Sequence, residues 1–286
     1  MKKKARNSIR SWLTIGISSL VMLTPFAGLT YIQATQVEKD SRDCLVSGKP
    51  HRLLLVLIDQ SDPFDAVDRE KVISAAVGER LNRLEQYDQV AVMTLNAEVP
   101  SKPVVLFQKC APKNPLQGDS LLDRLLNPPD ATKKQWAAFQ IELNAAIRRA
   151  LQEDEQATTP LLETLIAVAK DPDQERAQER TFLIFSDMIQ NTRWLNFYKA
   201  IPRISSAREL GIPVETGFFG ATSIYIHHIT RYQQGNGRPR TQRPSFRRQV
   251  KEFWNAWLQD QGAHVFWSEH LGEQGWDLLS REGSTR

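Results

Sequence analysis

The feature that most constrains this sequence is a continuous apolar run that ends in a carboxylate. Residues Leu53 to Ile58 are all aliphatic, and Asp59 follows them directly. A run without polar alternation is typical of a strand that is covered on both faces, as the central strands of parallel sheets are. The sequence therefore predicts a buried β-strand over 52–59 with an acidic group at its carboxyl end.

Further apolar runs alternate with helical patterns along the chain. Because right-handed crossovers place helices on both faces of a parallel sheet, this alternation predicts an α/β fold with a Rossmann-like, mostly parallel sheet. Ligands of such sheets bind at the carboxyl ends of the strands, near the switch in strand order. Besides 52–59, we expect strands at 89–95, 104–108, 181–187, 212–220 and 263–267. We expect helices that begin near residues 66, 121, 132 and 160, and helices at 195–210 and 246–261.

Two of these helices carry a prediction about how they begin. Thr132 and Gln135 have the spacing of a capping box, in which a hydroxyl and a side-chain amide satisfy the first backbone N–H groups. Thr159 precedes Pro160, and proline is favourable at a first helical position. We therefore expect Thr132 and Thr159 to be N-caps.

The N-terminal region has the composition of a membrane anchor. Cations are frequent in 1–11, whereas 12–32 contains no charged residue and is long enough to cross a bilayer. The positive charges place 1–11 in the cytoplasm and the rest of the chain outside it. We expect a single-pass protein of the inner membrane with a linker at 33–50, a periplasmic or otherwise extracytoplasmic domain at 51–268 and a tail at 269–286. The alternative is a signal peptide that is cleaved.

The cysteines and histidines give weaker indications. Cys44 and Cys110 are the two cysteines of the chain, and both follow the predicted span, where a disulfide can persist. Spacing alone leaves open whether they pair or are separate buried thiols. The histidines at 227, 228, 264 and 270 lack the spacing of a metal site, so we interpret them as strand or surface residues.

Bulk composition favours one sizeable domain. Hydrophobic residues make up 41% of the 286 positions and charged residues 24%, which is enough to bury a large core. The net charge of +4 comes largely from the N-terminus and from a basic run between Arg231 and Lys251. We interpret this run as a solvated loop rather than a surface that docks onto an acidic protein, an anionic lipid or a polyanion. A nucleic-acid partner is not expected, because no zinc-finger or RNA-recognition signature is present.

Three segments place oxygen-bearing side chains at the predicted carboxyl edge of the sheet. Asp59 follows the first strand, Asp187 ends the strand at 181–187, and Thr159 lies between them before a helix. In order and placement they resemble the metal-ion-dependent adhesion site of von Willebrand factor A (vWA) domains. In that family an Asp-x-Ser-x-Ser motif follows the first strand, a threonine precedes a helix and an aspartate ends the fourth strand. Asp59, Ser61, Thr159 and Asp187 occupy the matching positions.

The resemblance implies a binding protein rather than an enzyme. In vWA domains the ion offers an open coordination position to a carboxylate of a partner protein, so Mg²⁺ or another divalent cation is the implied cofactor. This sequence departs from the motif at Pro63, which replaces the second serine and offers no hydroxyl. Asp62 is the auxiliary carboxylate that we expect to compensate, and Asp65 is also near. The alternative is a metal-free scaffold in which Asp59, Thr159 and Asp187 only bind nearby backbone groups.

An enzymatic alternative starts from the same aspartate. Haloacid dehalogenase-like phosphotransferases also carry a nucleophilic aspartate after the first strand, which makes Asp59 a candidate for a phosphotransferase or hydrolase. Those enzymes need a second aspartate two residues later as general acid, and this chain has Ser61 there. The chain also lacks the serine-hydrolase, Walker A and zinc-protease signatures.

Overall fold

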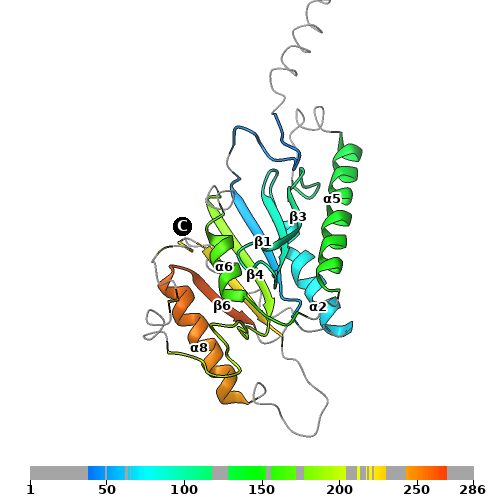
Figure 1. The fold of residues 1–286 in the computed structure, drawn as a ribbon. Helices are drawn as coiled ribbons and strands as arrows, with labels where there is room; N and C mark the ends of the chain where they lie inside the picture. Colours follow the sequence, from blue (N-terminus) through cyan, green and yellow to red (C-terminus); the bar gives the residue numbers. More distant parts are fainter. Residues whose placement is uncertain are drawn as a thin grey trace, which may run out of the picture.

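A computed structural model of the chain shows one mixed β-sheet with helices on both sides (Figure 1). The described residues form six strands in the order β3-β2-β1-β4-β5-β6. All neighbouring strands are parallel except β2 and β3, which are antiparallel. This is the strand order of Rossmann sheets, so the predicted α/β class and mostly parallel sheet are confirmed. The structure describes residues 38–48, 50–61, 64, 66–117, 128–152, 156–171, 177–203, 211–212, 217, 219–220, 222–229 and 243–268.

Most of the predicted elements are present. The predicted strands at 52–59, 89–95, 104–108, 181–187 and 263–267 and the predicted helices near 66, 160 and 246 all have counterparts, and the helix expected near 121 lies outside the described residues. The strands are β1 (Arg52–Ile58), β2 (Gln89–Thr94), β3 (Val104–Cys110), β4 (Glu179–Ser186), β5 (Thr222–His228) and β6 (His264–Ser268). The helices are α2 (Ala66–Val77), α3 (Glu79–Asn82), α5 (Pro129–Ala150), α6 (Leu161–Ala169) and α8 (Pro244–Asp260).

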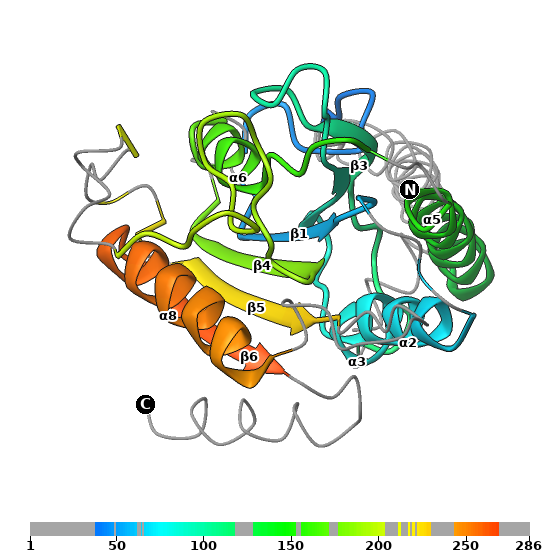
Figure 2. The same cartoon turned by 60° about the horizontal axis from the view of Figure 1, so that its bottom comes forward.

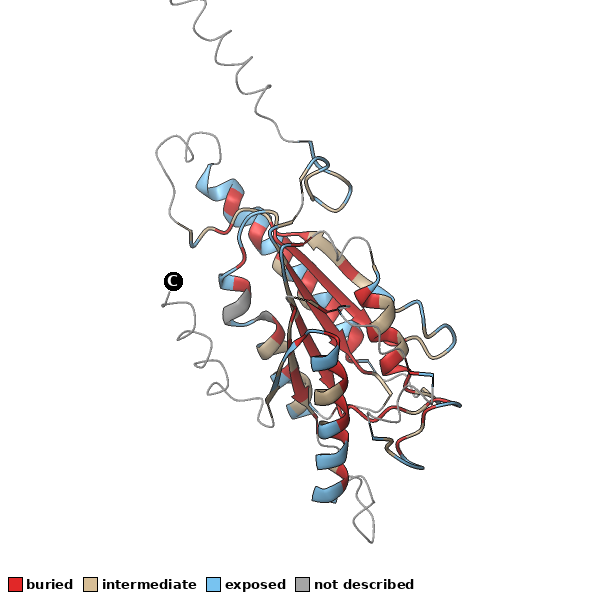
Figure 3. Ribbon diagram, turned by 90° about the vertical axis from the view of Figure 1, so that its left-hand side faces the viewer, coloured by how far each residue is buried: buried red, intermediate tan, exposed pale blue. Residues whose placement is uncertain are grey.

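Strand β1 lies at the centre of the sheet and contributes side chains to two hydrophobic cores, one on each face. Leu53, Leu55 and Leu57 pack into the core that contains α6 and α8. Leu54 and Val56 point the other way, into the core that contains α2 and α5. Figure 2 shows the two helical layers on opposite faces of the sheet, and Figure 3 shows the central strands buried along their length. Because both faces of β1 are covered from Leu53 to Ile58, all six of these positions are apolar.

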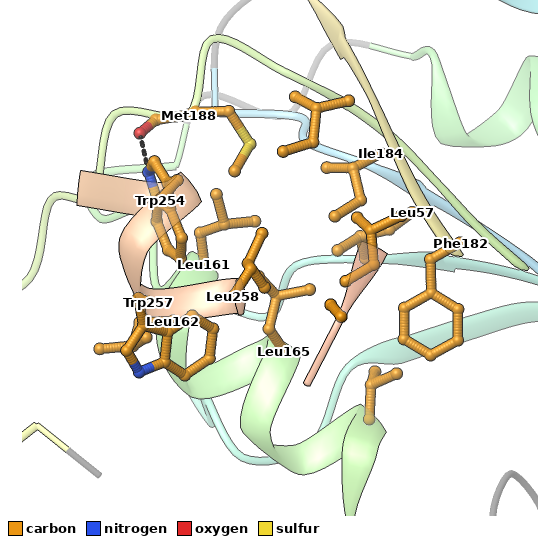
Figure 4. Close-up of a cluster of buried hydrophobic side chains, with 14 of the residues drawn as sticks. Leu57, Leu161, Leu162, Leu165, Phe182, Ile184, Met188, Trp254, Trp257 and Leu258 are labelled. Carbon is orange, nitrogen blue, oxygen red and sulfur yellow. Dashed lines mark hydrogen bonds between the residues drawn. The ribbon is translucent and has the colours of Figure 1, made fainter. Parts of the chain in front are cut away.

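Helix α8 packs in the hydrophobic core and also binds the segment that follows β4. Trp254 and Trp257 are fully buried in α8 and pack with leucines of α6 (Figure 4). Trp254 Nε1 donates a 2.7 Å hydrogen bond to the Met188 carbonyl oxygen. The chain immediately after β4 is therefore held by a buried donor on a regular helix.

The region between β4 and β5 differs from the sequence prediction. The helix predicted at 195–210 is absent from its described part, 195–203, and none of the described residues of the strand predicted at 212–220 lies in a strand. Thr192 Oγ1 donates to the Leu195 carbonyl oxygen at 3.2 Å, and Asn196 Oδ1 accepts from Lys199 N at 3.2 Å. Such local side-chain bonds compete with helical hydrogen bonding. The actual strand, β5, begins at Thr222.

The predicted N-caps are also wrong. Helix α5 begins before Thr132, and the Thr132 hydroxyl bonds back to the Pro128 carbonyl oxygen at 3.4 Å instead of capping the helix. Helix α6 has Pro160 at its N-cap without a side-chain cap from that residue. The buried Gln190, far along the chain, supplies the cap, because its Oε1 accepts from Leu162 N at 2.9 Å.

The predicted helix after residue 66 is divided at Gly78. Helix α2 ends at Val77, and the short α3 begins at Glu79. A Cβ atom at Gly78 would lie only 2.6 Å from the Ser74 carbonyl oxygen, so the chain makes a turn there that a larger residue could not make.

The two cysteines form a disulfide. The Cα atoms of Cys44 and Cys110 are 4.9 Å apart, and the bond joins the segment before β1 to the end of β3 across 66 residues. A stable disulfide is typical of chains outside the reducing cytosol. The histidines at 227 and 228 lie in β5 and His264 begins β6, as predicted, whereas His270 lies outside the described residues.

The predicted membrane span at 12–32 and the tail at 269–286 both lie outside the described residues. None of the helices that the structure describes combines the length and apolar character needed to cross a bilayer. The anchor and the domain boundaries that depend on it therefore stay predictions.

Candidate functional site

The candidate site lies at the switch point of the sheet. Strands β1 and β4 are neighbours and parallel. The chain continues from β1 toward β2 on one side and from β4 toward β5 on the other. In sheets of this kind the carboxyl ends of the strands at the switch point border the ligand-binding crevice. Asp59 follows β1 and Asp187 follows β4, so both carboxylates are placed at this edge.

Asp59 is fully buried and firmly positioned. Its backbone N–H donates to the Phe185 carbonyl oxygen at 3.0 Å, which extends the pairing of β1 with β4 by one residue. Its Oδ1 accepts from Ser61 N at 3.0 Å, and its Oδ2 accepts from the Ser186 hydroxyl at 2.6 Å. Both carboxylate oxygens therefore accept a hydrogen bond from the protein.

Asp187 is the second buried carboxylate. Its Oδ1 accepts from Ile189 N at 2.9 Å. Burial raises the pKa of Asp187 from 3.8 to about 8, the negative charge of Asp59 adds to this rise, and the Ile189 N–H opposes it. Because Asp59 adds to the raised proton affinity of Asp187, a cation between the two carboxylates would offset both the burial of Asp187 and the repulsion that it meets.

The backbone after Asp187 is held in an unusual conformation. Met188 has a φ of 60°, in the left-handed region that residues with a side chain seldom adopt. Its N–H donates to the Ser186 hydroxyl at 2.8 Å, and its carbonyl oxygen accepts from Trp254. Strain of this kind is stored where surrounding contacts overdetermine it, commonly at functional sites.

The loop before α6 joins the same edge. Thr159 N donates to the Asn191 carbonyl oxygen at 2.8 Å, and Asn191 N donates back to the Thr159 carbonyl oxygen at 3.1 Å. The buried Thr159 is thereby tied to the segment that begins with Asp187. The structure thus brings together the segments of Asp59, Ser61, Thr159 and Asp187. The fifth predicted residue, Asp62, lies outside the described residues, as do Pro63 and Asp65.

Two residues of the site were not predicted as site residues. Ser186 bridges the strands, because its hydroxyl donates to Asp59 and accepts from Met188. In the sequence, its position directly before Asp187 could have identified Ser186 as a site residue. Tyr198 is the other, since burial and then the charges of Asp187 and Asp59 raise the pKa of its phenol to about 12. Tyr198 lay in a predicted helix, which hid its relation to the site.

The donor set fits a hard divalent cation with few protein ligands. Among the described residues, no group of three or more His, Cys, Asp or Glu side chains is arranged to hold a metal ion. Two carboxylates with neighbouring hydroxyl-bearing residues provide oxygen atoms only, which suits Mg²⁺ with water in its remaining positions.

The same geometry does not suit a nucleophilic aspartate. A carboxylate that attacks phosphorus needs an accessible oxygen with a free lone pair along the line of attack. Asp59 has no exposed surface that a phosphate could reach. The phosphotransferase alternative gains no support from this arrangement.

Comparisons with known proteins return remote structural similarity only. No protein-family model and no curated protein sequence matches the chain. BatB from Bacteroides thetaiotaomicron, a conserved hypothetical protein, is 10% identical over 81% of this chain and 97% of its own, with a TM-score of 0.40. The PilB minor pilin from Streptococcus sanguinis is 11% identical over 82% of this chain and 60% of its own, with a TM-score of 0.40. An aerotolerance-related membrane protein from Bacteroides fragilis is 9% identical over 80% of this chain and 96% of its own, with a TM-score of 0.34. Similarity at this level carries no function over to this chain.

Proposed function

We propose that this chain is a vWA-like binding domain that engages a partner protein through the carboxyl edge of its sheet, with a divalent cation such as Mg²⁺ held at Asp59 and Asp187. The observation that carries the proposal is the pair of buried carboxyl groups directly after β1 and β4, at the switch point of the sheet. Burying two ionised carboxylates together is costly unless a cation or a proton neutralises one of the charges.

The residues of the site divide the work of holding the ion. Asp187 and Asp59 supply negative charge, directly or through water, and Ser61 and Thr159 supply hydroxyl oxygens. Asp62 is the carboxylate that compensates for the missing hydroxyl at Pro63. The bound ion accepts a carboxylate from the partner, and the surrounding loops discriminate between partners. Turnover is not part of this function.

The predicted anchor gives the domain its place in the cell. Residues 12–32 would span the inner membrane with the domain on the periplasmic or extracytoplasmic side. The disulfide between Cys44 and Cys110 supports that side, because such bonds persist outside the cytosol. The linker precedes the amino end of β1, so the site at the opposite end of the strand is directed away from the anchored end.

One observation favours a second candidate, the metal-free scaffold. Asp59 and Asp187 each accept a hydrogen bond from the backbone N–H two residues later, which is the usual structural role of an aspartate in a turn. In that case the two carboxylates would only shape their loops, and no ion would bind.

Calorimetric titration of the full chain in detergent with MgCl₂ and MnCl₂ separates the two candidates. We expect one ion to bind and to raise the melting temperature. Asp187→Asn should abolish both effects. The exposed carboxylate of Asp130, in the first turn of α5, provides the control, so Asp130→Asn should bind like the wild type. Wild-type protein that shows neither heat nor a thermal shift in excess Mg²⁺ and Mn²⁺ would establish the metal-free scaffold instead.

A further inference from the structure

A small hairpin that follows β4 presents a tryptophan beside the candidate site. Asn191 and Asn196 pair across the hairpin, and Asn196 Nδ2 donates to Asn191 Oδ1 at 2.8 Å. Asn191 also pairs with Thr159, which ties the base of the hairpin to the site. Trp194 lies at the tip. The hairpin is therefore a fixed part of the carboxyl edge rather than a loose connection.

The indole of Trp194 is held by a relay of hydrogen bonds. Its Nε1 donates to Glu163 Oε1 at 2.7 Å. Glu163 Oε2 accepts from Gln190 Nε2 at 2.8 Å, and the Oε1 of the same buried Gln190 accepts from Leu162 N. The orientation of an exposed ring is thus set by a buried amide that caps α6.

A large part of this fixed ring nevertheless remains uncovered. Trp194 is 47% exposed, and Tyr198, four residues later, is 45% exposed. An aromatic side chain with a satisfied polar group and a preset orientation loses little entropy on binding. Tryptophan and tyrosine of this kind supply much of the binding energy at protein interfaces.

The charge of the same segment indicates what would bind. Residues 188–203 contain Arg193, Lys199 and Arg203 and no acidic residue. All three cations are exposed. Glu163 adjoins the ring of Trp194, but the exposed charges of the segment itself are all positive. A segment that combines exposed cations with exposed aromatic rings is complementary to an acidic segment with an apolar side chain.

We propose that residues 191–203, with Trp194 as the anchor, form the surface that selects the partner, and that the partner is a protein whose binding segment carries acidic residues next to an apolar one. This inference rests on the proposed function, because it uses the same edge of the sheet. A membrane surface is the less suitable occupant, since the site lies at the carboxyl end of β1 and the predicted linker precedes its amino end.

Selection of short random peptides against the detergent-solubilised full chain in Mg²⁺ tests this surface. Enriched peptides should contain Asp or Glu beside an apolar residue. Trp194→Ala should weaken their binding about thirtyfold, the effect of losing a central interface aromatic. Glu163→Ala should weaken binding less, because the ring remains but its orientation is free. Phe266→Ala, at a 39% exposed aromatic of β6, is the matched control and should leave binding unchanged.

Several results would overturn the proposal. These are a lack of enrichment, enriched peptides without acidic residues, and equal binding to Trp194→Ala and wild type. Trp194-dependent binding to phosphatidylglycerol vesicles would assign the surface to a membrane instead. A dimer that forms in ultracentrifugation and is lost in Trp194→Ala would assign it to a second copy of the chain.

The same variants separate this inference from the proposed function. Peptides whose binding depends on Trp194, but which bind Asp187→Asn as well as the wild type or bind without Mg²⁺, would support the partner surface at 191–203. They would also show that this surface works without an ion. Mg²⁺ binding that is lost in Asp187→Asn would support the ion site. If the enriched peptides then bind Trp194→Ala as well as the wild type, the proposed partner surface at 191–203 is wrong.

Discussion

The two ends of the central strands each bury a carboxylate, but with opposite companions. At the amino end, Asp88 Oδ2 accepts from Glu85 N at 2.7 Å and lies 3.2 Å from Arg52 Nε. Burial raises the pKa of Asp88, while the Glu85 N–H and the Arg52 charge oppose that rise. At the carboxyl end, the neighbour of Asp187 is a second carboxylate, Asp59, which adds to the rise.

This difference separates an end of the molecule that is closed by stabilising contacts from the end where we propose that a partner binds. The amino end is closed by complementary charge and by the disulfide, and Ala111 N donates to the Asp88 carbonyl oxygen at 2.7 Å. The carboxyl end keeps the repulsion between two carboxylates, which no nearby cation offsets among the described residues. Local arrangements that reduce stability are expected where a fold carries function.

The largest expected effect is at the amino end. Replacing both Cys44 and Cys110 by alanine removes a cross-link over 66 residues and should lower the free energy of unfolding by about 4 kcal/mol. Denaturant unfolding measures this change, and calorimetry should show unaltered Mg²⁺ affinity. A large loss of Mg²⁺ affinity would mean that the two ends are not independent.

The second effect concerns the charge that accompanies Asp88. Arg52→Met leaves the buried carboxylate without its cation and should cost about 2 kcal/mol. Arg52 also pairs with the exposed Glu85, so Glu85→Gln is the control and should cost much less. Equal losses in the two variants would show that Arg52 does not act through Asp88.

The third effect has the opposite sign. In chelator, Asp187→Asn removes the repulsion but keeps an oxygen for the Ile189 N–H, so it should stabilise the protein by on the order of 2 kcal/mol. The folded pKa of Asp187 lies near 8 and its ordinary value is 3.8. The folded state therefore binds more protons between these values, and wild-type stability should fall as pH rises from about 4 to about 8.

Chemical unfolding across this pH range provides the measurement. The variant should lose the Asp187 part of the pH slope, and its advantage over the wild type should be greatest above pH 8. A variant that is less stable than wild type in chelator would contradict the repulsion at this end of the sheet.

The smallest effect comes from the bridge between the two strands. Ser186→Ala removes the hydroxyl that donates to Asp59 and accepts from Met188, and should cost about 1 kcal/mol in chelator. Ser186→Thr keeps the hydroxyl and serves as the control for its hydrogen bonds. A loss in Ser186→Thr as large as in Ser186→Ala would assign the effect to packing rather than to the bridge.

The central strands could be predicted because a strand that is buried on both faces consists of consecutive apolar residues, and such a run is recognisable in the sequence. Strand β1 contains that pattern in full. Strand β5 was missed because Ile224 and Ile226 alternate with less buried residues, whereas the more apolar stretch before it attracted the prediction. Ile212 and Phe219 of that stretch are indeed buried in the core, but neither lies in a strand. Hydrophobicity alone does not separate these two situations.

The candidate site was partly predictable for a related reason. Asp59 and Asp187 could be found because each directly follows a recognisable strand. Gln190 and Glu163 could not, because their roles depend on a hairpin and a helix that meet only in the folded chain. Side-chain relays between distant segments leave no periodic signal in the sequence.

The central claim is that Asp59 and Asp187 hold one ion between them. The most direct measurement is anomalous diffraction from crystals grown with Mn²⁺ in place of Mg²⁺. We predict a strong peak between the two carboxylates, within direct or water-mediated coordination distance of both, that is missing in crystals of Asp187→Asn. Ordered carboxylates with no peak between them, at a Mn²⁺ concentration that saturates surface sites, would contradict the account.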